Sequence, residues 1–195
     1  MSRGPLITRL GQLAASGEWR MRREALLAHD VRRGRHDFVL DLGSGRSPLL
    51  GHLTPERYVG LDLHPADLAY AERRFGRPGY EFVQADFMEA PLEPWRGADV
   101  VTASAVFHHL TDQQVVELVG RLQDQVRPGR MVFTDGVTRG PLAGVLTRLD
   151  EGEPSRPREV LYELFRPRFE VVETWSYVVP FRTYLYFGFE LTPAG

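Results

Sequence analysis

Residues 38–50 read Phe-Val-Leu-Asp-Leu-Gly-Ser-Gly-Arg-Ser-Pro-Leu-Leu, a short apolar run followed at once by two glycines one residue apart. The run at 38–42 is apolar apart from one aspartate, which is typical of a strand buried in a parallel sheet. Glycine has no Cβ, so Gly43 and Gly45 permit a tight turn and let a ligand approach the backbone. The stretch predicts a strand, a turn and a helix, with a ligand bound at the turn.

The same alternation continues along the chain and predicts the fold class. Apolar runs rich in β-branched and aromatic residues predict strands at 38–42, 58–62, 81–85, 99–103, 130–135, 169–177 and 184–191. Helical periodicity predicts helices at 46–53, 65–75, 111–126 and 159–165. The last two strands are too close in sequence to be parallel, so one of them must be antiparallel. We therefore predict a doubly wound α/β fold: a mostly parallel seven-stranded sheet with one antiparallel strand near the C-terminus and helices on both faces.

The length of 195 residues fits one domain with a substantial core. Residues 12–35 carry apolar side chains at helical spacing, which predicts an N-terminal helical cap over residues 1–36, ahead of a ligand-binding domain over 37–195. Residues 136–155 are rich in glycine, proline and charge, and we expect a substrate-side insertion there with a short helix at 142–149. A turn is expected at 179–182.

Composition excludes several classes of protein. No apolar run approaches the ~20 residues of a membrane span, and the N-terminus lacks a secretory signal, so we expect a cytoplasmic protein. The absence of cysteine excludes disulfides, thiolate metal sites and a cysteine nucleophile. All 24 basic residues are arginine, which excludes lysine Schiff-base chemistry and is typical of a GC-rich genome. A net charge of −2 without a basic tract argues against nucleic acid as a partner and favours a small-molecule partner.

Acidic residues end the first three predicted strands. Asp41 is the last but one residue of the first strand and Asp62 closes the second, where a carboxylate can accept two hydrogen bonds from a ribose diol. Asp86 and Phe87 follow the third strand and suit an adenine amino group and ring face. The dinucleotide pattern G-x-G-x-x-G is broken at Pro48, and a phosphate-binding loop of the lysine type is impossible. The arrangement indicates a nucleoside.

In this order and spacing, these segments resemble the class I S-adenosylmethionine-dependent methyltransferases, especially small stand-alone bacterial enzymes that act on small molecules. The resemblance covers residues 37–135 and rests on the stretches 41–47, 62, 85–87 and 98–110. It implies a Rossmann-like fold, S-adenosyl-L-methionine as cofactor, S-adenosyl-L-homocysteine as product, and methyl transfer to an oxygen, nitrogen or carbon nucleophile of a small-molecule acceptor.

The resemblance also implies a set of cofactor-binding residues. The glycine turn would hold the methionine part, Asp62 the ribose hydroxyls, and Asp41 would act near the methionyl amino group, partly through water. Leu63 would pack on adenine, Asp86 would reach its exocyclic amine, and the backbone amide of Phe87 would meet a ring nitrogen. Ser47 stands where the fuller family loop has a third glycine. The whole implied set is Asp41, Gly43, Ser44, Gly45, Asp62, Leu63, Asp86, Phe87 and Ser104.

Two adjacent histidines, His108 and His109, follow the fourth predicted strand, where the transferred methyl group should lie. Either could remove a proton from an acceptor hydroxyl or amine. The alternative is a structural role, in packing or in a hydrogen bond to the helix that starts at Thr111. We predict no metal site, because adjacent histidines point in different directions and no further ligands stand at suitable spacing.

Three other functions share part of this pattern. An RNA-modifying methyltransferase would have the same cofactor half, but the mild acidity counts against it. A non-catalytic S-adenosylmethionine-binding scaffold or sensor is a further alternative, because the sequence identifies cofactor-binding residues but does not settle which residue is the base. A nicotinamide oxidoreductase is disfavoured by the broken glycine pattern. Nothing in the sequence requires an oligomer.

Overall fold

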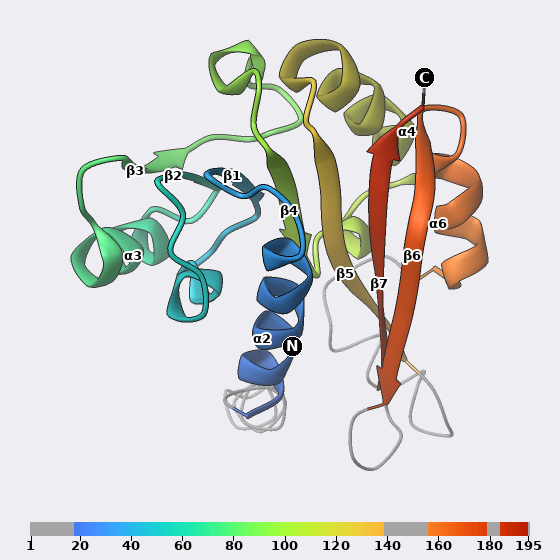
Figure 1. Ribbon diagram of the computed structural model, residues 1–195, viewed down its shortest axis with the longest axis horizontal. Coiled ribbons are helices and arrows are strands. Elements are labelled where there is room, and N and C mark those ends of the chain that lie inside the picture. The colour runs from blue at the N-terminus through green and yellow to red at the C-terminus, as the bar shows by residue number, and fades with distance from the viewer. Residues whose placement is uncertain (1–17, 139–155, 179–183, 195) are drawn as a thin grey trace, which may run out of the picture.

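The computed structural model describes residues 18–138, 156–178 and 184–194, and they form one seven-stranded sheet (Figure 1). The strand order is β3-β2-β1-β4-β5-β7-β6, and only β7 runs antiparallel to its neighbours. The strands are β1 (Phe38–Leu42), β2 (Arg57–Asp62), β3 (Tyr80–Gln84), β4 (Val100–Ser104), β5 (Arg130–Thr138), β6 (Phe169–Val178) and β7 (Tyr184–Pro193). The predicted fold class is confirmed.

Helices connect the strands and cover the sheet. They are α2 (Glu18–Arg32), α3 (Pro65–Phe75), α4 (Asp112–Arg121), α6 (Arg158–Phe165), the 3₁₀ turns η1 (Pro48–Gly51), η2 (Glu93–Trp95) and η3 (Phe107–His109), and the π-helical turn η4 (Leu122–Val126). Thr111 caps α4: its hydroxyl accepts the Gln114 N–H, and the Gln114 side chain accepts the Thr111 N–H. The expected helix at 142–149 and turn at 179–182 lie outside the described residues.

Two predicted helices differ from the structure. The helix expected at 46–53 is a single 3₁₀ turn, because Ser47 has a left-handed backbone (φ +50°) and Pro48 offers no N–H to a longer helix. The helix expected at 111–126 is α-helical only to Arg121 and then widens into η4. Arg127, left-handed at φ +53°, and Pro128 end it.

Alternation along the strands divides the core between the two faces of the sheet. One face carries Leu40, Val59, Val101 and Phe133 and packs against buried residues of α4 and α6. The other carries Val39, Tyr58, Val100 and Val132 and packs against α2 and η1. Leu27, Ala28 and Val31 of α2 are completely buried, so this helix shares the hydrophobic core of the sheet.

Arg130, at the start of β5, fixes the C-terminal end of α2. Its guanidinium donates to the Asp30 carbonyl at 3.0 Å and to the Val31 carbonyl, and it also contacts the Glu190 carboxylate at 3.2 Å. A cation at the last turn of a helix satisfies carbonyls that have no partner within the helix. Because α2 ends at the amino edge of the sheet, its first turn lies toward the carboxyl edge, where the parallel strands finish (Figure 1).

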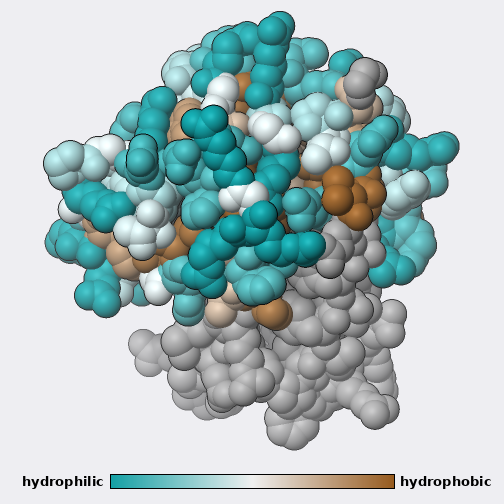
Figure 2. All heavy atoms as spheres, viewed as in Figure 1, coloured by the Kyte–Doolittle hydropathy of each residue, from teal (hydrophilic) through white to brown (hydrophobic). Residues whose placement is uncertain are grey.

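The face shown in Figure 2 is mainly polar over the described residues, with apolar side chains in small separate patches. Within the described parts of the chain, no helix combines the length and apolarity needed to cross a bilayer.

Candidate functional site at the carboxyl edge of the sheet

The turn after β1 has the backbone geometry that its glycines permit. Gly43 and Gly45 have φ values of +64° and +51°, in the left-handed region that other residues rarely adopt. A Cβ on Gly43 would lie 2.7 Å from Val106 Cγ2, so this glycine lets the turn pack against the segment that follows β4. A Cβ on Gly45 would meet nothing nearer than Asp62 Oδ2 at 3.9 Å. Gly45 therefore presents open backbone to a ligand.

Asp62, at the end of β2, completes a cradle that also comprises the glycine turn at 43–45 and Leu63. Its Oδ2 accepts the Gly45 N–H at 2.7 Å, and its Oδ1 accepts the His64 N–H at 2.8 Å, with His64 Nδ1 at 3.0 Å. A carboxylate offers about four lone-pair positions, so Asp62 can also accept hydrogen bonds from a diol. The next residue, Leu63, is 54% exposed although it is large and apolar. The cradle thus combines an oriented carboxylate with an apolar platform.

Asp41 lies beneath the turn and is 4% exposed. Its carboxylate accepts the Tyr58 hydroxyl at 2.6 Å and the Thr102 hydroxyl at 2.8 Å, which links β1 to both neighbouring strands. Burial of a carboxylate is tolerated when such donors satisfy it. Its described contacts give Asp41 a role in fixing the strand ends below the turn.

The two serines of the turn are buried, and their hydroxyls lack a hydrogen-bond partner among the described residues. Ser44 Oγ lies against Gly60, where a Cβ would meet it at 2.7 Å, while the Ser44 N–H donates to the Leu61 carbonyl at 3.0 Å. Ser47 is left-handed at φ +50°, as the glycine of the fuller family loop would readily be. The conformation of the loop is thus kept although its third glycine is absent.

The turn after β3 carries Asp86 and Phe87. The Asp86 carboxylate accepts the Met88 N–H at 2.8 Å and remains exposed, whereas Phe87 is partly buried against the core. Arg121, at the end of α4, donates to the Phe87 carbonyl at 2.8 Å and also to the carbonyls of Met88 and Ala90. Sequence reasoning missed this arginine, because its partners lie more than thirty residues away.

The segment after β4 lies beside the glycine turn through Val106. Ser104 Oγ is 3.4 Å from Thr134 Oγ1 on β5, and the Ala105 N–H donates to the Thr134 carbonyl at 2.8 Å. Ala105 is left-handed at φ +59°, a strained conformation for alanine that turns the chain sharply into η3. The two histidines of η3 are thereby brought to the same edge as the cradle.

The structure distinguishes the two histidines. His108 Nδ1 is 2.7 Å from Asp135 Oδ1 on β5, and these side chains are only 14% and 3% exposed. His109 is exposed, and its ring lies 4.0 Å from that of His108, centroid to centroid. Asp135 was not among the predicted site residues. The available signal was its place as an acid at the end of the fifth predicted strand, as Asp41 and Asp62 are near the ends of the first and second.

A second arginine, Arg156, holds η3 against α4. Its guanidinium donates to the Phe107 carbonyl at 2.8 Å and to the Leu110 carbonyl, and pairs with Asp112 at 2.5 Å. Only 11% of its side chain is exposed. Arg156 therefore fixes both ends of the turn that carries the histidines.

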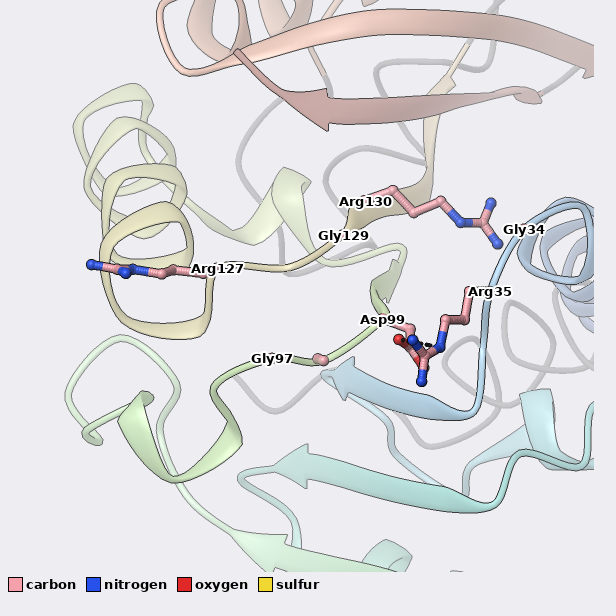
Figure 3. A pocket seen from close by; sticks show the side chains of 8 residues that line it. Gly34, Arg35, Gly97, Asp99, Arg127, Gly129 and Arg130 are labelled. Atoms are coloured by element: carbon pink, nitrogen blue, oxygen red, sulfur yellow. Dashed lines mark ion pairs between the residues drawn. The ribbon is translucent and has the colours of Figure 1, made fainter. Parts of the chain in front are cut away.

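A surface hollow of about 490 Å³ lies at the opposite, amino edge of the sheet (Figure 3). Its lining includes Arg35, Arg127 and Arg130, but Arg35 pairs with Asp99 at 3.0 Å and Arg130 holds α2. The Arg127 side chain points away from the others in Figure 3. Ligands of open α/β sheets bind at the carboxyl edge, and every polar side chain of the cradle lies there. We therefore place the functional site at the carboxyl edge.

Comparison with known proteins shows what the chain is similar to. Residues 39–129 match the family model described as a methyltransferase domain, which spans the glycine turn, Asp62, Asp86 and both histidines. Over these residues, slightly less than half of its length, the chain is similar to a methyltransferase domain. The match to this domain confirms the resemblance seen in the sequence, and S-adenosylmethionine is the cofactor of such domains.

Curated relatives of this methyltransferase domain align over part of their length. The chain is 32% identical over 137 residues to acetylserotonin O-methyltransferase of Rattus norvegicus, covering 64% of this chain and 31% of the relative. It is 36% identical over 97 residues to phthiotriol/phenolphthiotriol dimycocerosates methyltransferase 1 of Mycobacterium ulcerans, covering 48% and 34%. The chain thus spans about a third of each of these two relatives.

Solved structures share the fold of the methyltransferase domain. A S-adenosylmethionine-dependent methyltransferase of Leishmania major superposes with a TM-score of 0.74 at 15% identity, covering 95% of this chain and 78% of the other. An N-methyltransferase of Bradyrhizobium japonicum in complex with S-adenosyl-L-homocysteine gives 0.66 at 16% identity, covering 90% and 86%.

Proposed function

We propose that this chain transfers the methyl group of S-adenosylmethionine to an oxygen, nitrogen or carbon nucleophile of a small-molecule acceptor. The observation that carries the proposal is the hydrogen bond from the Gly45 N–H to Asp62 at 2.7 Å, beside backbone that no side chain of the described residues covers. The names of the relatives, an acetylserotonin O-methyltransferase and a phthiotriol/phenolphthiotriol dimycocerosates methyltransferase, support a small-molecule acceptor. A net charge of −2 favours such an acceptor over nucleic acid.

The residues of the cradle fit the cofactor chemically. Asp62 would accept the ribose hydroxyls, the exposed side chain of Leu63 would cover an adenine face, and the open backbone at Gly45 would border the methionine part. Asp86 and the backbone of Phe87 would meet the adenine edge. Asp41 would act from beneath the turn, partly through water, Ser44 would belong to the turn that borders the methionine part, and Ser104 would border the reacting methyl group.

When bound, S-adenosylmethionine supplies an electrophilic methyl group on a sulfonium that leaves as a neutral thioether. The chain therefore has to align the acceptor with the carbon–sulfur bond, and alignment alone can lower a barrier by about 7–11 kcal/mol in favourable cases. His108 or His109 would remove a proton from the acceptor where one must be lost. Residues 1–36 and the insertion at 136–155 would border the acceptor side of the domain over 37–195.

A turnover assay tests the proposed function. The purified chain, incubated with S-adenosylmethionine and a panel of small hydroxyl, amine and carbon acids, should release S-adenosylhomocysteine with at least one acceptor. Tight cofactor binding without release for any acceptor would instead favour a binding scaffold. Methylation of RNA in preference to the whole panel would contradict the assignment of a small-molecule acceptor. Our proposal also places this activity in the cytoplasm of a bacterium.

A further inference from the structure

We propose that Asp135 is a positioning residue that makes His108, rather than His109, the base of the reaction, and that the acceptor atom is the oxygen of a phenolic or enolic hydroxyl. The inference rests on the proposed methyl transfer and narrows its acceptor. It begins from the contact of 2.7 Å between His108 Nδ1 and Asp135 Oδ1.

The contact fixes the protonation of the His108 ring. A carboxylate oxygen can only accept a hydrogen bond, so the proton of the neutral imidazole lies on Nδ1 and the lone pair on Nε2. The Asp135 side chain is 3% exposed, and a buried carboxylate is stable only with a donor of this kind. Asp135 thus holds His108 in the tautomer that can take a proton through Nε2.

The surrounding structure holds this pair rigidly. Phe107, next to His108, and Phe133, two residues before Asp135, pack with ring centroids 4.7 Å apart, and Phe165 packs against both. The strained backbone of Ala105 and the guanidinium of Arg156 fix the two sides of η3. A pair on such a support keeps its geometry without a bound ligand.

The pair also lies next to the cofactor cradle. Val106, two residues before His108, occupies the space where a Cβ on Gly43 would clash. The charged or titratable side chains that the structure places around His108 are Asp135, the exposed His109 ring, and the Arg156–Asp112 pair at the start of α4. Among the described contacts, Asp135 lies against His108, and this contact sets the tautomer of His108.

A base of this kind selects its acceptor. Once an amine has lost its ammonium proton it is already a good nucleophile, whereas a neutral hydroxyl stays a weak nucleophile until its own proton leaves, so a hydroxyl gains more from a base in the methyl-transfer step. A phenolic hydroxyl, with an ordinary pKa of about 10, gives its proton to an imidazole far more readily than an alkanol does, because the pKa of an alkanol is much higher. The pair therefore favours phenols and enols over alkanols and amines.

The step balances with no further reactant. The acceptor hydroxyl gives its proton to His108 Nε2, and the oxygen lone pair forms the new bond to the methyl carbon. The carbon–sulfur bond breaks with its electron pair staying on sulfur, which becomes a neutral thioether. His108 then releases the proton to water, so one proton appears for each methyl ether formed.

The test combines a spectroscopic readout with turnover. In ¹⁵N NMR spectra of the histidine rings, neutral His108 should carry its proton on Nδ1 in the wild-type chain, and Asp135→Asn should change the ring signals of His108. Asp135→Asn should also lower methylation of catechol or acetylacetone about 100-fold or more in kcat. Its affinity for S-adenosylhomocysteine, measured by calorimetry, should match the wild type.

Asp99→Asn is the matched control, because Asp99 is another mostly buried carboxylate, 13% exposed, that pairs with Arg35 at the opposite edge of the sheet. This variant should keep both the ring signals of His108 and the turnover. His108→Gln, which leaves the carboxylate in place, should lose the same turnover as Asp135→Asn.

Three results would overturn the inference: a neutral His108 ring protonated on Nε2 in the wild type, full turnover in Asp135→Asn, or methylation of benzylamine or benzyl alcohol in preference to catechol and acetylacetone. Failure of the proposed function itself looks different, since the wild-type chain would then bind no S-adenosylhomocysteine, or would bind it and turn over no acceptor, while the tautomer of His108 could still be measured.

Discussion

A protein uses glycine at a turn either because the backbone has a positive φ or because a neighbouring group needs the space of the side chain. At Gly45 we expect both reasons to apply. Its φ of +51° strains any side chain, and the space around it is open toward the cradle, with only Asp62 Oδ2 at 3.9 Å from a Cβ. Gly97, before β4, has a φ of +81° and nothing within 4 Å of a Cβ. The two residues thus share backbone strain, and only Gly45 lies at the proposed ligand site.

We therefore predict that Gly45→Ala and Gly97→Ala each lower the free energy of unfolding by about 1 kcal/mol, because alanine is unfavourable at positive φ. Gly45→Ala should also weaken S-adenosylhomocysteine binding about tenfold, since its methyl group occupies ligand space. Urea unfolding and calorimetry on both variants measure the two effects. Equal cofactor affinity in the two variants would show that no ligand approaches the backbone at Gly45.

At the scale of elements, η3 depends on Arg156. The guanidinium satisfies the carbonyls of Phe107 and Leu110, while the amides of His109 and Leu110 close the turn to Val106 and Phe107 at 3.0 and 3.1 Å. Hydrogen bonds to a charged group contribute about 1.5–3 kcal/mol each when a partner is removed. Loss of this side chain should therefore loosen the turn that carries His108.

Arg156→Ala should speed hydrogen exchange at residues 105–112 and reduce turnover. Arg158→Ala is the control, since Arg158 is 44% exposed and pairs only weakly with Glu159 at 3.4 Å among its described contacts. Hydrogen-exchange mass spectrometry compares the two variants. Unchanged exchange over 105–112 in Arg156→Ala would mean that η3 holds its shape without the arginine.

Most elements could be predicted from local sequence, because a run of β-branched and apolar residues specifies a strand whatever its neighbours. The strand at 38–42 matches its prediction at both ends. β5 extends to Thr138, three residues past its expected end, because β7 pairs with it there. The helix expected at 46–53 is shorter than predicted because Ser47 has a left-handed backbone, which hydrophobic periodicity does not predict.

The residues of the site also differ in whether local sequence could predict them. Gly45 and Asp62 could be predicted because each stands at the end of its own strand, and the order of parallel strands brings such ends together. Asp135 had the same signal at the end of the fifth predicted strand and was missed, whereas Arg121 and Arg156 could not be predicted, since their partners are 34 and 49 residues away in sequence. Contacts of this kind follow from the packing of α4, α6 and β5 and leave no local pattern.

At the scale of the whole molecule, the amino and carboxyl edges of the sheet have different roles. Arg130 holds α2 at the amino edge, and the three buried residues of α2 complete the core on that face. The carboxyl edge carries the polar side chains at the ends of β1, β2, β4 and β5. A rigid sheet with one polar edge can hold a cofactor and an acceptor in fixed relation, which is what methyl transfer requires.

The central claim is that this edge binds an adenosyl sulfonium compound through Gly45 and Asp62, and titration calorimetry on the whole chain tests it most directly. We predict one site for S-adenosylmethionine and for S-adenosylhomocysteine. Asp62→Ala should weaken binding about 10- to 100-fold, as expected when hydrogen bonds to a carboxylate are lost. Glu81→Gln, which removes an exposed carboxylate from β3, should bind as the wild type does. Absence of heat with either compound, or equal affinities in Asp62→Ala and the wild type, would contradict the claim.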